Sequence, residues 1–233
     1  MEGLSPQRNS ERRWGTRERP LPLRWIGDAP PRRDDRDAKP FNFSAALKRI
    51  VADVVQRVPL FSHIDPNGLL YAATMARTAK RSGLLASITP LRFEHGQAYR
   101  QSRGRLYQIQ RFYLDGRELM YVFTCCLPRF LDQSFEEKWI TIFHEMFHIG
   151  PKFDGDLRRH EGRCRFHTHS KKQYDAAMGR LVRPYLAEHP QPELFAWLHD
   201  TFAQLQSKHG GLYAIKVPRP RIVPVDETPR DRT

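Results

Sequence analysis

Residues 134–169 read SFEEKWITIFHEMFHIGPKFDGDLRRHEGRCRFHTH and contain the motif H-E-x-x-H at His144, Glu145 and His148. Two residues four positions apart on a helix project from the same face, so both imidazoles can reach one Zn²⁺ ion. Glu145 lies beside them, where a carboxylate can take a proton from a water that the ion has acidified. The stretch therefore predicts a helix that carries a zinc centre for hydrolysis.

The flanking residues predict where this helix begins and ends. Ser134 followed three residues later by Glu137 is a capping-box pattern, which is typical of a helix start. Gly150 and Pro151 predict that the helix ends just after His148. Apolar residues recur at the spacing of a buried helix stripe, namely Phe135, Trp139, Phe143, Met146 and Phe147. The motif is expected on a helix whose other face is packed.

Catalytic zinc usually takes three protein ligands and keeps one open position, so a third ligand is needed. Asp154 lies six residues after His148, the distance used in the metzincin class. That pattern also places a glycine three residues after the second histidine, and Pro151 stands there instead. Asp154 is therefore the weakest of four candidates.

The other three candidates are histidines, of which we favour His169. Ser170 and Gln173 form a second capping-box pattern, which places His169 just before a helix start, from where its ring can point back to the metal helix. His167 is the next choice, because ligands two apart in an extended segment point to opposite sides and only one would bind. His160, in a charged loop, remains a third possibility.

Hydrophobic periodicity predicts an α+β domain. The expected elements in order are helix 44–58, strand 69–75, strand 84–93, strands 106–114 and 118–127, helix 171–186, helix 193–206 and strand 212–217. Ser44 is a candidate N-cap, and Pro90 indicates that its strand either lies at a sheet edge or is interrupted there. Asp115, Gly116 and Arg117 predict a hairpin loop. The expected architecture is a small zincin-like domain, with a short mixed or antiparallel sheet packed on the H-E-x-x-H helix and further helices toward the C-terminus.

Composition predicts one domain, residues 41–215, between two tails. Residues 1–40 are rich in arginine and proline and are expected to be disordered, and residues 216–233 are expected to be flexible. The large apolar residues of the first tail are expected to dock on the domain or on a partner: Trp14, Leu21, Leu23, Trp25 and Ile26.

The chain has a formal net charge of +13 and a pI near 10.0, which favours polyanions such as nucleic acid or an acidic partner. No nucleic-acid-binding motif accompanies this charge. Three cysteines, Cys125, Cys126 and Cys164, show no metal or disulfide spacing, which fits a reducing, cytoplasmic environment. No apolar run is long enough to span a membrane, so no membrane partner is expected.

The segment RFLDQSFEEKWITIFHEMFHIGPKFDGDLRRH, together with HIDPNGLL and ITPLRF upstream, resembles the phage-type metallopeptidase family of bacteria, archaea and phages. The resemblance runs from about residue 64 to 186. It implies that His144 and His148 are metal ligands and that Glu145 is the catalytic acid and base. Archaeal relatives place a histidine where His160 stands.

A looser similarity links the chain to SprT-like proteases, in which H-E-x-x-H precedes a histidine at the head of a helix and an aromatic residue. His169 and Tyr174 resemble that pair, but the spacing to the aromatic is one residue longer and no zinc ribbon follows. These departures weaken a transfer of the DNA-linked role of those proteases.

The sequence thus predicts a zinc metalloendopeptidase that hydrolyses protein or peptide substrates. Tyr174, or an arginine of the pair Arg158 and Arg159, is a candidate for stabilising the oxyanion. Two alternatives stay open. One is a nucleic-acid-associated, SprT-like protein in which proteolysis is specialised or lost, and the other is a non-catalytic domain with a closed structural zinc site.

Overall fold

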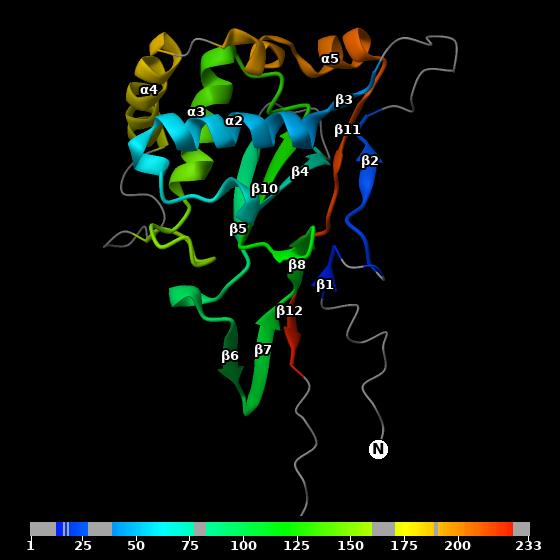
Figure 1. The fold of residues 1–233 in the computed structure, drawn as a ribbon, viewed down its shortest axis with the longest axis vertical. Helices are drawn as coiled ribbons and strands as arrows, with labels where there is room; N and C mark the ends of the chain where they lie inside the picture. Colours follow the sequence, from blue (N-terminus) through cyan, green and yellow to red (C-terminus); the bar gives the residue numbers. More distant parts are fainter. Residues whose placement is uncertain are drawn as a thin grey trace, which may run out of the picture.

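The computed structural model shows an α+β protein (Figure 1). It describes residues 13–15, 17, 19–27, 39–76, 83–159, 171–188 and 191–225, with the side chains of all of these except 171–174. A six-stranded mixed sheet forms the centre, and two smaller three-stranded sheets adjoin it. No helix in the described part of the chain is both long and apolar enough to cross a membrane.

The main sheet has the strand order β2-β11-β4-β10-β5, and β3 pairs with β11. Its strands are β2 (Leu23–Trp25), β3 (Phe41–Asn42), β4 (Leu69–Met75), β5 (Ala86–Pro90), β10 (Tyr121–Leu127) and β11 (Leu212–Ile215). β4 and β10 run parallel, whereas β5 runs antiparallel to β10 and forms one edge. The predicted edge position of Pro90 and the predicted bounds of β4 are confirmed.

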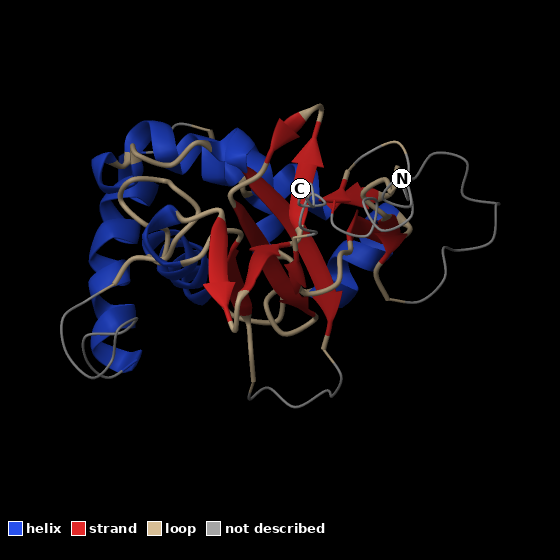
Figure 2. Cartoon of the chain, turned by 90° about the horizontal axis from the view of Figure 1, so that it is seen from below, coloured by secondary structure: helices blue, strands red, loops and turns tan. Residues whose placement is uncertain are grey.

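Four α-helices supply the main core. They are α2 (Phe43–Arg57), α3 (Phe135–Phe147), α4 (Lys171–Glu188) and α5 (Phe202–His209). Their buried side chains share one cluster with alternate residues of β4 and β10, such as Tyr71 and Phe123. The side chains at the intervening positions of the two strands, such as Ala72 of β4 and Val122 of β10, belong to a smaller cluster on the other side of the sheet. Figure 2 shows most of the helical residues on one side of the strands.

α2 begins one residue earlier than predicted, and Asn42 caps it where Ser44 was expected to. The Oδ1 atom of Asn42 accepts a hydrogen bond from the N–H of Ala45 at 3.0 Å. Ser44 is buried inside the helix, and its hydroxyl accepts from the N–H of Ile215 at 2.9 Å. Ser44 therefore joins α2 to β11.

The hairpin around Asp115 and Gly116 is much shorter than predicted. β8 (Arg111–Leu114) and β9 (Arg117–Glu118) flank a two-residue turn whose φ angles are 51° and 78°, as in a type I′ turn. The strand before this hairpin and the strand after it belong to two different sheets. β10 joins the main sheet, whereas β7 (Arg105–Ile109) pairs with β6 (Tyr99–Ser102) and β12 (Ile222–Pro224).

The single helix predicted over 193–206 is wrong. The chain forms η4 (Pro192–Leu194), η5 (Ala196–His199) and then α5. Thr201 starts α5 through a capping box with Gln204. The buried Lys138 of α3 donates from Nζ to the carbonyl oxygens of Leu198 and Asp200, both at 2.8 Å. These two carbonyls are therefore satisfied by a tertiary contact instead of by a continuing helix.

Parts of both expected tails belong to the sheets. β1 (Arg13–Trp14) pairs with β8, β2 pairs with β11, and β12 pairs with β7. Trp14 stacks on Phe112 at 6.2 Å between ring centroids, and Ile26 is only 1% exposed. The expected docking of these two residues on the domain is confirmed. Residues 1–12, 28–38 and 226–233 lie outside the described part of the chain.

Candidate metal centre

The helix predicted for the motif is α3. Ser134 is its N-cap, and the capping box with Glu137 is present in both directions. Trp139, Phe143 and Met146 are fully buried, as the apolar stripe predicts. The last regular residue is Phe147, so the second histidine of the motif occupies the C-cap. The helix therefore presents its histidines at the end where it meets the following loop.

The rings of His144 and His148 lie side by side, with centroids 4.9 Å apart and an angle of 69° between the ring planes. Two imidazoles that bind one tetrahedral zinc, each with a nitrogen about 2.1 Å from the ion, have ring centres about 5 Å apart. The side chain of His144 is 13% exposed, so the site is sheltered but reachable. The distance between the two ring centres is therefore that of a pair of histidines on one zinc ion.

Asp175 of α4 orients the first histidine. Its Oδ1 lies 3.2 Å from Nδ1 of His144. A carboxylate accepts, so in the neutral ring this contact favours the tautomer with the proton on Nδ1 and the lone pair on Nε2. Histidines that bind metals commonly donate their other ring nitrogen to a carboxylate in this way. The contact makes Nε2 of His144 the ring nitrogen that could bind a metal ion.

Glu145 lies between α3 and the edge strand β5. Its Oε2 accepts a hydrogen bond from the N–H of Ile88 at 2.9 Å. Burial raises the pKa of Glu145 to about 7, against a smaller lowering by that hydrogen bond. Burial, and secondly the charge of Glu145, also raise the pKa of the Cys125 thiol on β10. A carboxyl group with a pKa near neutrality can accept a proton and return it in one cycle.

The loop after α3 folds back and holds the end of the helix. The N–H of Arg158 donates to the carbonyl of His148 at 2.8 Å, and its Nε donates to the carbonyl of Phe147 at 2.9 Å. The guanidinium lies over the Phe147 ring at 4.4 Å. Arg158 thus satisfies two of the last carbonyls of α3 and places a positive charge at its negative end. In this position it supports the backbone of His148.

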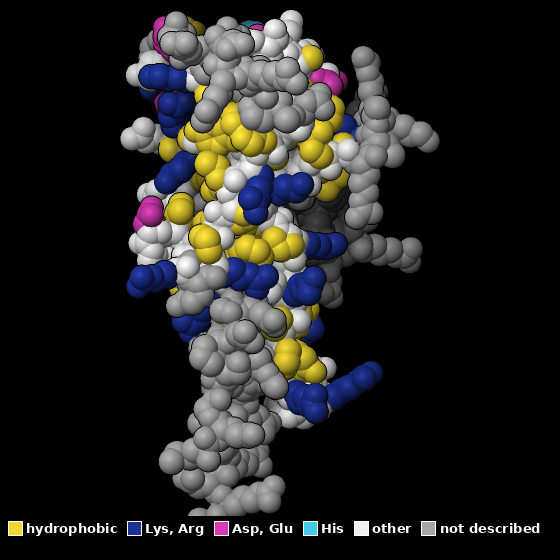
Figure 3. All heavy atoms as spheres, turned by 90° about the vertical axis from the view of Figure 1, so that its right-hand side faces the viewer, with side chains coloured by type: hydrophobic (Ala, Val, Ile, Leu, Met, Phe, Trp, Pro, Cys, Tyr) yellow, Lys and Arg dark blue, Asp and Glu magenta, His cyan; other side chains and the backbone are white. Residues whose placement is uncertain are grey.

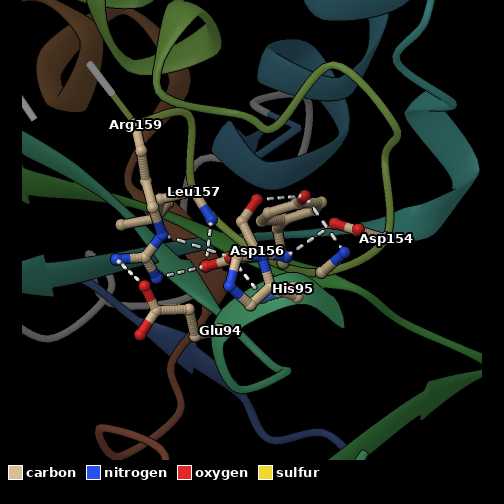
Figure 4. Close-up of polar contacts among 8 residues, drawn as sticks. Glu94, His95, Asp154, Asp156, Leu157 and Arg159 are labelled. Atoms are coloured by element: carbon tan, nitrogen blue, oxygen red, sulfur yellow. Dashed lines mark hydrogen bonds and ion pairs between the residues drawn. The ribbon is translucent and has the colours of Figure 1, made fainter. Parts of the chain in front are cut away.

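Asp156 anchors the same loop, and Figure 4 shows its contacts. The carboxylate accepts from the backbone N–H groups of His95 and Leu157, both at 2.8 Å. It also accepts from the guanidinium of Arg159 at 2.9 Å, and Arg159 pairs in addition with Glu94 at 3.2 Å. Arg159, one of the residues considered for the oxyanion, is therefore engaged by two carboxylates.

Tyr121 of β10 ties the loop to the main sheet. Its hydroxyl donates to the carbonyl of Asp156 at 2.7 Å and accepts from the N–H of Gly155 at 3.1 Å. The N–H of Gly150 donates to the same carbonyl of Asp156 at 3.1 Å. These three hydrogen bonds hold the loop that follows His148 against β10 and the end of α3, and they restrict the position of that histidine.

The three histidines considered for the third ligand, His160, His167 and His169, lie outside the described residues, as does the side chain of Tyr174. Asp154 is described, and its Oδ1 accepts from the N–H of Asp156 at 3.2 Å. Within the part of the chain that the structure describes, no three histidine, cysteine or acidic side chains form a metal-binding group. The structure therefore places His144 and His148 beside each other, directs the carboxyl group of Glu145 to β5, and does not add Asp154 to the pair.

Sequence reasoning missed Asp175 and the N–H of Ile88. They are 31 and 57 residues away from their partners in the chain, so no local pattern links them. A comparison with known proteins finds no match among family models, curated proteins or solved structures. The functional conclusion therefore depends on the site and not on a relative.

Proposed function

We propose that this protein is a zinc-dependent peptidase with a zincin-like arrangement of helix and sheet. One observation carries the proposal. α3 holds two imidazoles at the separation that a single zinc ion requires, next to a carboxyl group whose pKa is raised to about 7. A structural zinc site has no use for such a carboxyl group beside its ligands. This combination favours hydrolysis over a purely structural role.

His144 and His148 would hold the ion together with a third ligand, for which His169 is our first candidate and His160 and His167 are the alternatives. Zinc at such a site supplies Lewis acidity for water and for the scissile carbonyl. Glu145 takes the proton from the attacking water and delivers it to the leaving amine. Its burial suits both steps, because a carboxyl group of ordinary pKa would hold the proton too weakly at neutral pH.

The strand next to Glu145 can position a peptide substrate. The carbonyl of Leu85 accepts from β10, and the N–H of Leu91 donates to the residue before β10. The direction of the backbone groups alternates along a strand. The N–H and C=O groups of Ala86 and Ile88, and the carbonyl of Pro90, therefore point away from β10. β5 is a sheet edge, and the N–H of Ile88 already donates to Glu145. An extended peptide can pair with the backbone groups of Ala86 and the carbonyl of Ile88, which brings a peptide bond to Glu145.

The test combines zinc content with cleavage of an unfolded protein by the purified full chain. We expect one zinc per chain in the wild type and in Glu145→Gln, and loss of zinc in His144→Ala. Cleavage should fall by about 10²-fold or more in Glu145→Gln, since general acid–base catalysis contributes on that order. Glu136→Gln is the matched control, because Glu136 is an exposed residue of the same helix.

Undiminished cleavage by Glu145→Gln would remove Glu145 from the mechanism. Full zinc content in His144→Ala would refute the metal site itself. The variants His169→Ala, His160→Ala and His167→Ala, measured in the same way, identify the third ligand as the one whose loss releases zinc.

A further inference from the structure

The three-stranded sheet of β6, β7 and β12 extends away from the main sheet, at the lower end of the molecule in Figure 1. We call it the arm, and it comprises residues 99–109 and 219–225. All four residues of β6 are exposed, as are the first two of β7. A sheet this small contributes little core, so its side chains are available for contact with a partner.

The charged residues of the arm and of its base, the adjoining residues 110–114 and 216–218, are all basic. Residues 99–114 and 216–225 contain no aspartate or glutamate. They contain seven basic residues, Arg100, Arg103, Arg105, Arg111, Lys216, Arg219 and Arg221. In Figure 3, which views one side of the molecule, Lys and Arg side chains continue down the lower half, whereas Asp and Glu side chains are visible only in the upper half.

No carboxylate among the described residues neutralises the positive charges of the arm itself. Among the described residues, the five arm arginines, at positions 100, 103, 105, 219 and 221, form no ion pair. Two arginines close to the arm are different, because Arg92 and Arg111 both pair with Glu118. The arm therefore presents guanidinium groups whose donors are available to an external anion.

The strand register gathers some of these groups on one face. Arg100 lies directly opposite Tyr107, and Arg105 lies two residues before that tyrosine on the same strand. Side chains at paired and alternate positions share a face, so one face carries two arginines and a tyrosine. Arg103 and Gly104 form the tip of the ribbon, with φ of 48° and 73°. The guanidinium of Arg100 is held over the ring of Phe93 at 4.8 Å.

We propose that the arm binds double-stranded nucleic acid, with the ribbon tip in a groove and its arginines on the phosphates. A guanidinium group binds phosphate through two parallel hydrogen bonds. A two-stranded ribbon fits a major groove about 12 Å wide, and several DNA-binding proteins use strands in this way. This inference does not depend on the proposed peptidase activity, because none of the arm residues belongs to the metal centre.

The distribution of apolar residues favours nucleic acid over a membrane. Leu106 and Ile222 are the exposed aliphatic residues of the arm, at 39% and 52%. Ile222 pairs with Ile109, whereas Leu106 is at an even position of β7, so the two lie on opposite faces. The tip consists of Ser102, Arg103 and Gly104 and has no apolar side chain to insert into lipid.

The experiment measures binding of a fluorescent 20-base-pair DNA duplex to the full-length chain by anisotropy, from 50 to 200 mM salt. The arm variant is Arg100→Gln, Arg103→Asn and Arg105→Gln, with asparagine at the tip because it tolerates positive φ. The control variant, Arg49→Gln, Arg180→Gln and Arg183→Gln, removes the same charge from exposed positions of α2 and α4. Thermal unfolding establishes that both variants are folded.

We expect the arm variant to bind the duplex at least about 10-fold more weakly at 100 mM salt, with the slope of log K against log salt reduced by about 3, because each lost phosphate contact contributes about 0.9. The control variant should stay within about twofold of the wild type. If the arm variant does not fold, Arg219→Gln with Arg221→Gln on β12 replaces it, with an expected slope change of about 2.

Equal weakening in both variants would show general attraction and overturn the proposal. So would wild-type affinity in the arm variant. A single strand that binds more tightly than DNA and RNA duplexes would exclude groove binding. Binding to vesicles of anionic phospholipid without binding to any duplex would assign the arm to membranes instead.

Discussion

Replacement of Glu145 by glutamine should stabilise the metal-free protein at neutral and alkaline pH. Burial raises the pKa of Glu145 to about 7, from an unfolded value near 4.5. The folded state therefore binds more protons than the unfolded state between these two pH values, so the unfolding free energy falls as pH rises through this window. Glutamine does not ionise, and its side-chain oxygen can still accept from the N–H of Ile88.

The size of the effect follows from the difference in pKa. A difference of about 2.5 pH units at about 1.4 kcal/mol per unit corresponds to an upper bound of about 3.5 kcal/mol. The residue keeps part of its surface in contact with solvent, which screens the charge and reduces the effect to about 1–3 kcal/mol. At pH 4.5 wild type and variant should have nearly equal stability, because the wild-type carboxyl group is then largely protonated in the folded state.

Urea unfolding in the presence of a chelator, at pH 4.5, 6, 7 and 8, measures this difference. Other titrating groups are common to both proteins and cancel. Glu136→Gln, which changes an exposed carboxylate paired with Arg183, should show no such increase in stability with pH. A difference between Glu145→Gln and wild type that stays constant from pH 4.5 to 8, or a variant that is less stable at pH 8, would refute the reasoning about burial.

Three further predictions concern the supports of the site and the fold. Asp175→Asn should weaken zinc binding by about 10- to 100-fold in a chelator competition, since it removes the carboxylate that orients His144; unchanged affinity would show that the contact is incidental. Tyr121→Phe removes both hydrogen bonds of the hydroxyl to the loop after α3, and we expect a loss of about 1–3 kcal/mol in urea unfolding. Asn42→Ala should cost about 1 kcal/mol because α2 loses its N-cap, whereas Asn42→Asp should retain most of the stability; equal losses in both would contradict the capping role.

The sequence was sufficient for several features that depend on neighbours along the chain. The start of α3 at Ser134, its buried stripe and the placement of both histidines on one face follow from capping chemistry and helical periodicity. The bounds of β4 and the edge position of Pro90 follow from strand propensity and from the missing N–H of proline.

Tertiary structure decided what depends on residues that are distant in the chain. The segment predicted as one helix over 193–206 is divided, and Lys138, about 60 residues away, takes the carbonyl oxygens of Leu198 and Asp200 at the second break. Similarly, only the folded chain brings Asp175 to His144 and the N–H of Ile88 to Glu145. Periodicity describes the face on which a side chain lies, but not the partner that the packing of α3 against α4 and β5 places opposite it.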